Sequence, residues 1–163
     1  MRIIGIDPGT AITGYSILEK SSKGIKLLEY GCIRTHKDLK DSNRLNQIAQ
    51  DIDTLIKKWQ PEIASIEKIF FQKNIKTAIS VAQARGVLIQ KLTEKNVEIT
   101  EFTPLEIKSA VCGYGKADKK MIQEMVKIIL GLQSIPKPDD AADAIAAAIC
   151  LSQSLPIRKL ITQ

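Results

Sequence analysis

The stretch MRIIGIDPGT, residues 1–10, decides the fold. Its Ile-rich run at residues 2–7 is typical of a short buried strand, and the Asp-Pro-Gly-Thr sequence that follows has the composition of a tight turn. Two more runs with strand character lie at residues 14–18 and 25–34, separated by a polar reversal. The first third of the chain therefore predicts an antiparallel β-meander.

The rest of the chain alternates between helix and strand patterns. Apolar residues between Ser42 and Trp59 recur at steps of three and four, as one face of a helix requires. Pro61 ends that helix, and a short apolar strand follows at residues 62–67. The remaining predicted elements are a helix at 74–94, a strand at 97–102, and helices at 104–112, 118–130 and 139–152. This alternation predicts an α/β fold with a mixed sheet.

Length and composition describe an ordinary globular chain. The 163 residues fit a single domain, which we expect at residues 1–155, followed by a short C-terminal tail at 156–163. No apolar run approaches the length that spans a membrane, and the N-terminus lacks the pattern of a signal peptide, so a cytoplasmic protein is expected. The three cysteines are widely spaced and are expected to be buried thiols.

The balance of charge favours a polyanionic partner. Twenty-four Lys and Arg residues against eighteen Asp and Glu residues give a net charge of +6. Such a charge steers a polyanion such as nucleic acid toward the protein and favours binding through counterion release. Charge alone leaves the question open, because many basic proteins of this size bind no nucleic acid.

Four carboxylates stand where chemistry is plausible. Asp7 and Glu67 each end a predicted strand, whereas Asp140 and Asp143 lie three apart at the start of the last helix and therefore share one face. Each has a structural alternative: a turn for Asp7, a solvated strand end for Glu67 and a helix cap for the first-turn aspartates. Asp143 is harder to explain in this way, since it is surrounded by alanines on a face that would pack closely.

If these acids converge, they predict a divalent metal site. Mutual repulsion would raise their pKa values unless a cation neutralised them. Oxygen ligands without nearby His or Cys favour Mg²⁺, with Mn²⁺ as a substitute, and the single histidine, His36, is expected on the surface. Two such ions can activate water and stabilise the leaving oxygen in phosphodiester hydrolysis, so two ions per subunit are expected.

Five segments in order resemble the RuvC family of bacterial Holliday junction resolvases. They are IGIDPGTAITGY, IEKIFFQKN, AQARGVL, TPLEIKSAVCGYGKADKKMIQ and DDAADAIAAAI, and together they extend over nearly the whole chain. The resemblance implies a ribonuclease-H-like fold with a mixed five-stranded sheet and helices on both faces. It also implies metal-dependent cleavage of two like-polarity strands of a four-way DNA junction, in homologous recombination and DNA repair.

The resemblance assigns roles to particular residues. The four metal ligands correspond to Asp7, Glu67, Asp140 and Asp143. The family's spacing of three selects Asp140 and makes Asp139 the helix cap, although Asp139 and Asp143, four apart, would also share a helix face. Two lysines near the scissile phosphate match Lys108 and Lys119, and the aromatic residue that stacks on an unpaired base matches Phe70. Solvated lysines and a core phenylalanine are the alternatives. The catalytic set implied is therefore Asp7, Glu67, Asp140, Asp143, Lys108 and Lys119.

Further basic residues and a partner subunit complete the hypothesis. Backbone phosphate contacts are expected from Lys73, Lys76, Arg85, Lys116 and Lys120. The two-fold symmetry of a junction favours a C₂ homodimer, for which the helix at 74–94 is the candidate element, with core packing an equal alternative. The resemblance further implies work beside the RuvA and RuvB branch-migration proteins.

Two other kinds of function fit part of the pattern. Asp-Pro-Gly-Thr also resembles the phosphate loop of actin-like kinases and ATPases, but those proteins place a nucleotide between two such domains and are far longer. A module that binds junctions without cutting them would share every binding feature. Loss of cleavage with retained binding in Asp7→Asn separates that module from a nuclease.

Overall fold

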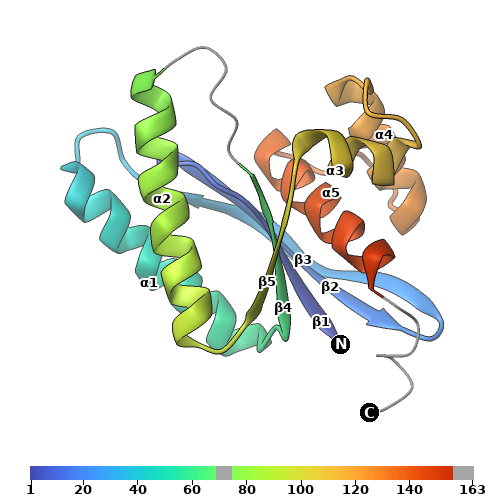
Figure 1. Ribbon diagram of the computed structural model, residues 1–163, viewed down its shortest axis with the longest axis horizontal. Helices are drawn as coiled ribbons and strands as arrows, with labels where there is room; N and C mark the ends of the chain where they lie inside the picture. The colour runs from blue at the N-terminus through green and yellow to red at the C-terminus, as the bar shows by residue number, and fades with distance from the viewer. Residues whose placement is uncertain (69–74, 156–163) are drawn as a thin grey trace.

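The strands form one mixed sheet at the centre of the molecule (Figure 1). A computed structural model describes residues 1–68 and 75–155, with side chains excluded at 75–77. In the described chain the sheet has five strands in the order β3-β2-β1-β4-β5. Their bounds are β1 Arg2–Asp7, β2 Ile12–Ser21, β3 Gly24–Arg34, β4 Ile63–Glu67 and β5 Glu98–Phe102.

The predicted meander is confirmed, and the parallel strands add to one side of it. Strands β1, β2 and β3 pair antiparallel, whereas β4 pairs parallel with both β1 and β5. β2 is longer than predicted, because Glu19 and Lys20 continue the pairing with β3 despite their polarity. Hydrogen bonding along an antiparallel ladder does not require an apolar side chain, so the apolar pattern underestimates such a strand.

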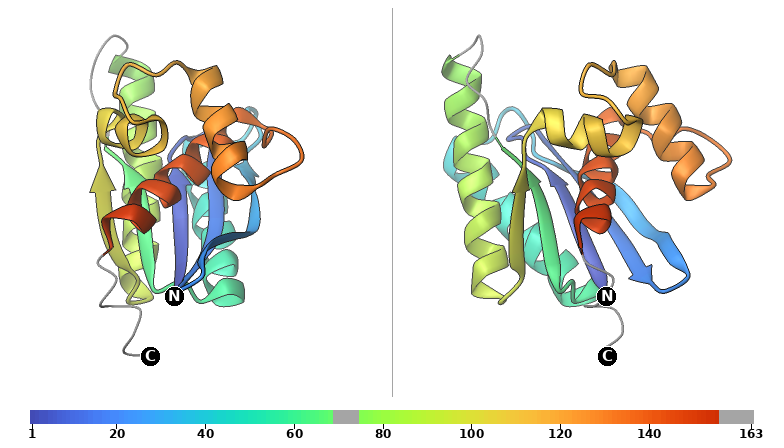
Figure 2. Two further views of the ribbon diagram at one scale, coloured as in Figure 1. Left: turned by 90° about the vertical axis from the view of Figure 1, so that its right-hand side faces the viewer. Right: turned by 45° about the vertical axis from the view of Figure 1, so that its right-hand side comes forward.

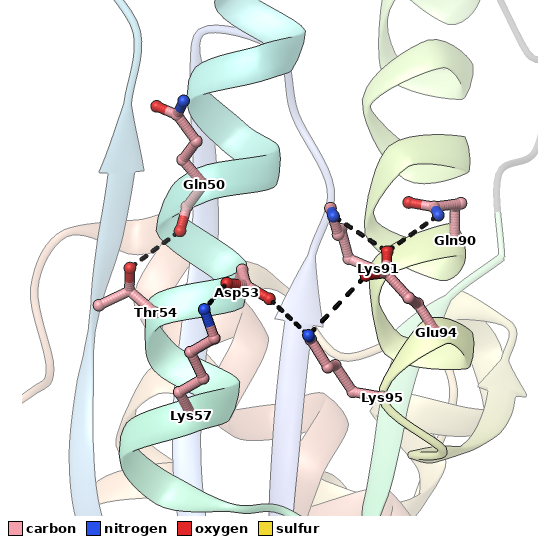
Figure 3. Close-up of polar contacts among 8 residues, drawn as sticks. All are labelled: Gln50, Asp53, Thr54, Lys57, Gln90, Lys91, Glu94 and Lys95. Atoms are coloured by element: carbon pink, nitrogen blue, oxygen red, sulfur yellow. Dashed lines mark hydrogen bonds and ion pairs between the residues drawn. The ribbon is translucent and has the colours of Figure 1, made fainter.

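Helices α1 (Asp41–Trp59) and α2 (Ile75–Glu94) cover one face of the sheet (Figure 1). Their buried residues pack with alternate residues of the strands, among them Ile4, Ile6 and Ile66. Lys95, just after α2, ties the two helices by pairing with Asp53 of α1 at 3.3 Å. Figure 3 shows this charged network on the outer side of the pair.

Helices α3 (Pro104–Cys112), α4 (Lys119–Leu130) and α5 (Asp139–Ser154) cover the opposite face (Figure 2). Helix α5 lies directly on the strands, because Gly5 and Gly14 carry no side chain where its backbone passes. The hydroxyls of Ser16 and Ser65 donate to the carbonyls of Ala144 and Ala147 at 2.9 and 2.7 Å. These contacts fix the position of α5 along the sheet, and helices on both faces confirm the predicted architecture.

The ends of the helices correct one expectation. Pro138 is the N-cap of α5 and Asp139 is its first residue, so Asp139 is not the helix cap. The Asp139 carboxylate turns instead toward α4, where Lys119 and Gln123 bind it. By contrast, Thr103 caps α3 with a reciprocal bond to Glu106, the T-x-x-E pattern visible in the sequence.

Several smaller expectations are also tested by the structure. His36 lies on the surface beside Asp38, as predicted. Cys150 is buried, whereas Cys32 and Cys112 are half-buried, and all three thiols are free. In residues 1–68 and 75–155 no helix has the length and apolar character needed to cross a membrane.

Candidate metal centre and active site

Strand alternation directs Asp7 and Glu67 to the same face of the sheet. Ile4 and Ile6 of β1 pack toward α1 and α2, so Ile3, Gly5 and Asp7 face α5. In β4, Ser65 bonds to α5 and Ile66 packs on the other side, so Glu67 also faces α5. Ile6 pairs with Ile66, which makes Asp7 and Glu67 neighbours one position further along. Both carboxylates therefore lie at one edge of the sheet.

Helix α5 brings Asp140 and Asp143 to this edge. Its first turn passes over Gly14, which is paired with Asp7 in the sheet. Asp143 is half-buried among alanines that are fully buried against the strands. Gly14 has no side chain at the point where the Asp140 backbone approaches, and this close approach places the start of α5 beside Asp7.

The carboxylates influence one another's pKa values. Burial raises the pKa of Asp7 to about 8, with further contributions from the negative charges of Asp143, Glu67 and Asp140. Burial and the charge of Asp143 raise the pKa of Glu67, which Lys108 opposes. Burial also raises the pKa of Asp143, although Lys119 acts in the other direction. The site accumulates negative charge that its own lysines do not fully compensate.

Lys119 and Lys108 approach the carboxylates from α4 and α3. The Lys119 Nζ lies 3.3 Å from Asp139 Oδ2 and 3.4 Å from Asp143 Oδ2. Lys108 and Lys119 line a small cavity of about 240 Å³ together with Glu67 and Asp143. Both lysines that the resemblance implied are therefore brought to the acidic site.

An open cleft leads to the carboxylates. It has a volume of about 710 Å³ and is bounded by Asp7 and Glu67 at the sheet edge, and by α3 and the loop after it. Thr103, Leu105 and Gly115 also line this cleft, and none of them was predicted from the sequence to be a site residue. The capping box of Thr103 and Glu106 could have located the start of α3, which forms one wall of the cleft. No sequence pattern indicates that Leu105 and Gly115 line a cleft.

The donor set fits a hard divalent cation, because the converging groups are carboxylates with raised pKa values. As the side chains stand in the described residues, no three Asp, Glu, His or Cys groups enclose one point closely enough to hold an ion. The Lys119 ammonium bridges Asp139 and Asp143 and supplies the positive charge there. The residues are present and adjacent, and coordination requires the carboxylates to turn toward an ion.

The other predicted contact residues are distributed differently. Lys116 and Lys120 are exposed near the start of α4, on either side of Lys119 in the sequence. Arg85 is mostly buried; it forms an ion pair with Glu101 and donates to the Glu67 carbonyl. Phe70 and Lys73 lie outside the described residues. Lys76 belongs to α2, but its side chain also lies outside them.

Nucleases with a ribonuclease-H-like fold have this arrangement: two carboxylates stand at the strand ends of a mixed sheet, and a helix packed on the sheet contributes further carboxylates. The chain belongs to one family within that class, the RuvC family, whose model, described as crossover junction endodeoxyribonuclease RuvC, matches residues 3–151. The enzyme class predicted from the sequence is thereby confirmed: the chain is an endodeoxyribonuclease that resolves crossover, or Holliday, junctions.

Individual relatives agree with this assignment. The crossover junction endodeoxyribonuclease RuvC of Finegoldia magna is 53% identical over 150 residues, covering 92% of each chain. Among solved structures, Thermus thermophilus RuvC in complex with a Holliday junction substrate has a TM-score of 0.86 at 29% identity, covering 92% of each chain. The yeast mitochondrial Holliday junction resolvase shares the fold, with a TM-score of 0.68 at 16% identity over 93% of this chain and 77% of that one.

Membership in the family carries two further points. It supports a metal-dependent nuclease, without specifying which ion acts or how many. It also supports a four-way DNA junction as the macromolecular partner.

Proposed function

We propose that this enzyme cuts one phosphodiester on each of two like-polarity strands of a four-way junction, leaving 5′-phosphate and 3′-hydroxyl ends. Asp7, Glu67, Asp140 and Asp143 hold two Mg²⁺ ions, for which Mn²⁺ substitutes. The observation that carries the proposal is the gathering of buried carboxylates: burial, with added contributions from the charges of Asp143, Glu67 and Asp140, raises the pKa of Asp7 to about 8. A cluster so costly in its ionised form is explained by a cation that neutralises it.

The chain's own groups divide the chemistry between them. When bound, the ions supply Lewis acidity and lower the pKa of coordinated water. Lys108 and Lys119 stabilise negative charge on the phosphoryl oxygens, since both border the cavity beside Glu67 and Asp143. Lys119 is held by Asp139 and Asp143, which keeps its ammonium next to the position of the phosphate.

DNA is held by residues around the cleft. Lys116 and Lys120 are exposed near Lys119 and contact backbone phosphates, together with Lys73 and Lys76. Phe70 stacks on an unpaired base at the junction centre, a role suited to an aromatic residue three positions beyond Glu67.

Two copies of the chain form a C₂ homodimer that matches the symmetry of the junction. Helix α2 supports this proposal through Ile79, Ala82 and Gly86, which point outward; Ile79 is 54% exposed. Ile89 packs against the core, so core packing rather than a dimer contact accounts for this residue. The enzyme acts as one domain, residues 1–155, in the cytoplasm, beside the RuvA and RuvB proteins in recombination and repair.

Cleavage of a labelled synthetic four-way junction tests the proposal directly. Wild-type protein with Mg²⁺ is expected to nick two strands of like polarity at symmetric positions, and Asp7→Asn is expected to bind the junction without cutting it. A matched RNA junction and a linear duplex serve as controls for substrate class. Cleavage that persists in Asp7→Asn, or that proceeds unchanged in EDTA, would contradict the assigned chemistry.

The pH dependence of stability provides a prediction about Asp7. Its folded pKa of about 8 lies above the ordinary value of 3.8, so the folded state binds more protons in that interval and stability falls as pH rises through it. Asp7→Asn mimics the protonated form and escapes this loss. Without metal, its melting temperature is expected to exceed that of wild type by more at about pH 8 than at about pH 5.

Thermal melts with and without Mg²⁺ check this expectation. Mg²⁺ is expected to stabilise wild type most at the higher pH and to stabilise Asp7→Asn much less. A difference between the two proteins that stays constant with pH would show that Asp7 does not titrate in this range.

A second prediction separates Asp140 from Asp139. Asp140 is half-buried and acts on the charge of Asp7, whereas Asp139 is 59% exposed and is bound by Lys119 and Gln123, which lower its pKa. Asp140→Asn is expected to lower the cleavage rate by more than about 100-fold, above the loss typical of an outer-shell partner. Asp139→Asn is expected to lower it by less than about 10-fold. Single-turnover rates on one junction measure both, and the reverse order would assign Asp139 to the metal.

A further inference from the structure

Arg85 joins the ends of two strands from behind the metal site. From α2 its guanidinium forms an ion pair with Glu101 of β5, and its Nε donates to the backbone carbonyl of Glu67 at 3.4 Å. The side chain is 19% exposed, which is low for arginine, a residue type that is mostly exposed in folded proteins. Its donors are directed into the protein.

The face of the sheet on which Arg85 lies is opposite to that of the metal carboxylates. Ile99 of β5 packs with the α1 and α2 cluster, so Glu101, two residues later, lies on the same face. Glu67 projects its carboxylate to the other face, toward α5. Figure 1 shows α2 and α5 on opposite sides of the sheet. Arg85 therefore contacts the backbone of Glu67 and not its carboxylate.

The contact falls where the described sheet ladder ends. Glu67 pairs with Phe102 as the last register position of β4 and β5, and the Lys68 amide donates to the Phe102 carbonyl at 2.8 Å. A strand end is held by fewer ladder bonds than a strand interior, so its direction depends on whatever else binds it. Arg85 supplies that binding and anchors it to Glu101 on the neighbouring strand.

We propose that Arg85 and Glu101 are positioning residues that fix the end of β4, so that the Glu67 carboxylate points toward Asp143 and the metal. This inference rests on the proposed role of Glu67 as a metal ligand. It replaces a direct phosphate contact as the function of Arg85. Outer-shell groups of this kind typically change metal affinity or activity by about 10- to 100-fold when removed.

Glu101→Gln distinguishes the two roles because they predict opposite results. If Arg85 contacted phosphate, removing its acidic partner would free the guanidinium, and junction binding would be kept or strengthened with cleavage intact. As a positioning pair, Glu101→Gln and Arg85→Lys are both expected to weaken Mn²⁺ binding and slow cleavage by about 10-fold or more. Junction affinity in EDTA is expected to match wild type.

The measurements are Mn²⁺ titration by electron paramagnetic resonance, junction anisotropy in EDTA, and single-turnover cleavage. Glu94→Gln is the matched control, since it removes the same charge from an ion pair with Lys91 at 2.9 Å (Figure 3). Glu94 is the last residue of α2, nine residues after Arg85 and so about 13 Å further along the helix. The control is expected to behave as wild type in all three. Far-UV circular dichroism checks that each variant is folded. If Arg85→Lys is unstable, Glu101→Gln still tests the positioning role, because glutamine has nearly the same shape as glutamate.

The outcomes separate this inference from the proposed function. Wild-type protein that binds Mn²⁺, with Glu101→Gln binding and cutting equally well, overturns the positioning role alone. Loss of junction affinity in EDTA for Arg85→Lys, with affinity retained in Glu101→Gln, assigns Arg85 to phosphate instead. Wild-type protein that binds no Mn²⁺ overturns the proposed metal site and this inference together.

Discussion

Asp143→Asn is expected to reduce junction cleavage by about 10³-fold, equal to about 4 kcal/mol of transition-state stabilisation. The negative charge of Asp143 contributes to the raised pKa values of both Asp7 and Glu67. The Asp143 carboxylate also forms an ion pair with Lys119 at 3.4 Å. Its removal takes away a metal ligand and one of the two anchors of a catalytic lysine. Single-turnover cleavage at saturating protein measures the loss.

The same variant is expected to be more stable than wild type in EDTA. Burial raises the pKa of Asp143, so its ionised form is unfavourable in the fold, and a neutral amide relieves that penalty and the repulsion on Asp7. Thermal melts without metal check the sign. A variant that loses both activity and metal-free stability would indicate that the Lys119 ion pair outweighs the repulsion, and would weaken the case for an acidic metal site.

Gly14→Ala is expected to lower the free energy of unfolding by about 3 kcal/mol and to abolish most cleavage. A β-carbon at Gly14 would overlap the backbone carbonyl of Asp140 and lie 3.1 Å from the Ala141 amide nitrogen. Backbone atoms cannot rotate away as a side chain can, so the first turn of α5 must move off the sheet. That displacement takes Asp140 and Asp143 away from Asp7.

Gly86→Ala supplies the matched control. Gly86 lies in α2, and a β-carbon there meets no atom within 4 Å. The substitution is expected to raise the free energy of unfolding by about 1 kcal/mol through helix propensity. Denaturant titrations compare the stability of the two variants. Both are measured at one protein concentration, because Gly86 lies on the face proposed for the dimer and the stability of a dimer depends on concentration. Equal stability of Gly14→Ala and wild type would show that α5 is not held as closely as the contact implies.

The sequence pattern was sufficient to predict the strands and to single out the four acids. The strands expected at residues 2–7 and 62–67 end at Asp7 and Glu67, and the pairing of β1 with β4 then shows that both carboxylates share a face. Helical spacing similarly places Asp140 and Asp143 together. These relations are local along the chain, and the structure agrees with them.

What could not be predicted are the partners across elements. Asp139 had the composition of a helix cap, but Lys119 and Gln123 of α4 bind it instead. Arg85 had the charge of a phosphate contact, yet Glu101 of β5, the next element in the chain, pairs with it. The strength of a polar pair depends on the distance between its two groups. A single sequence gives the charge of each residue but not the distance between residues on different elements, so these pairs could not be predicted from it.

The alanines of α5 give the enzyme an unusual distribution of mutational tolerance. Six of them are at most 1% exposed, and the helix that they form rests on the strand backbone at Gly5 and Gly14. A larger side chain at any of these buried positions would have to displace packed neighbours, although none of the alanines is a proposed ligand. A library of single substitutions selected for resolution should therefore be depleted at Ala141, Ala144 and Ala148 almost as strongly as at the acids. New specificities are accordingly accessible through the cleft walls, while the helix that bears the acids stays nearly invariant.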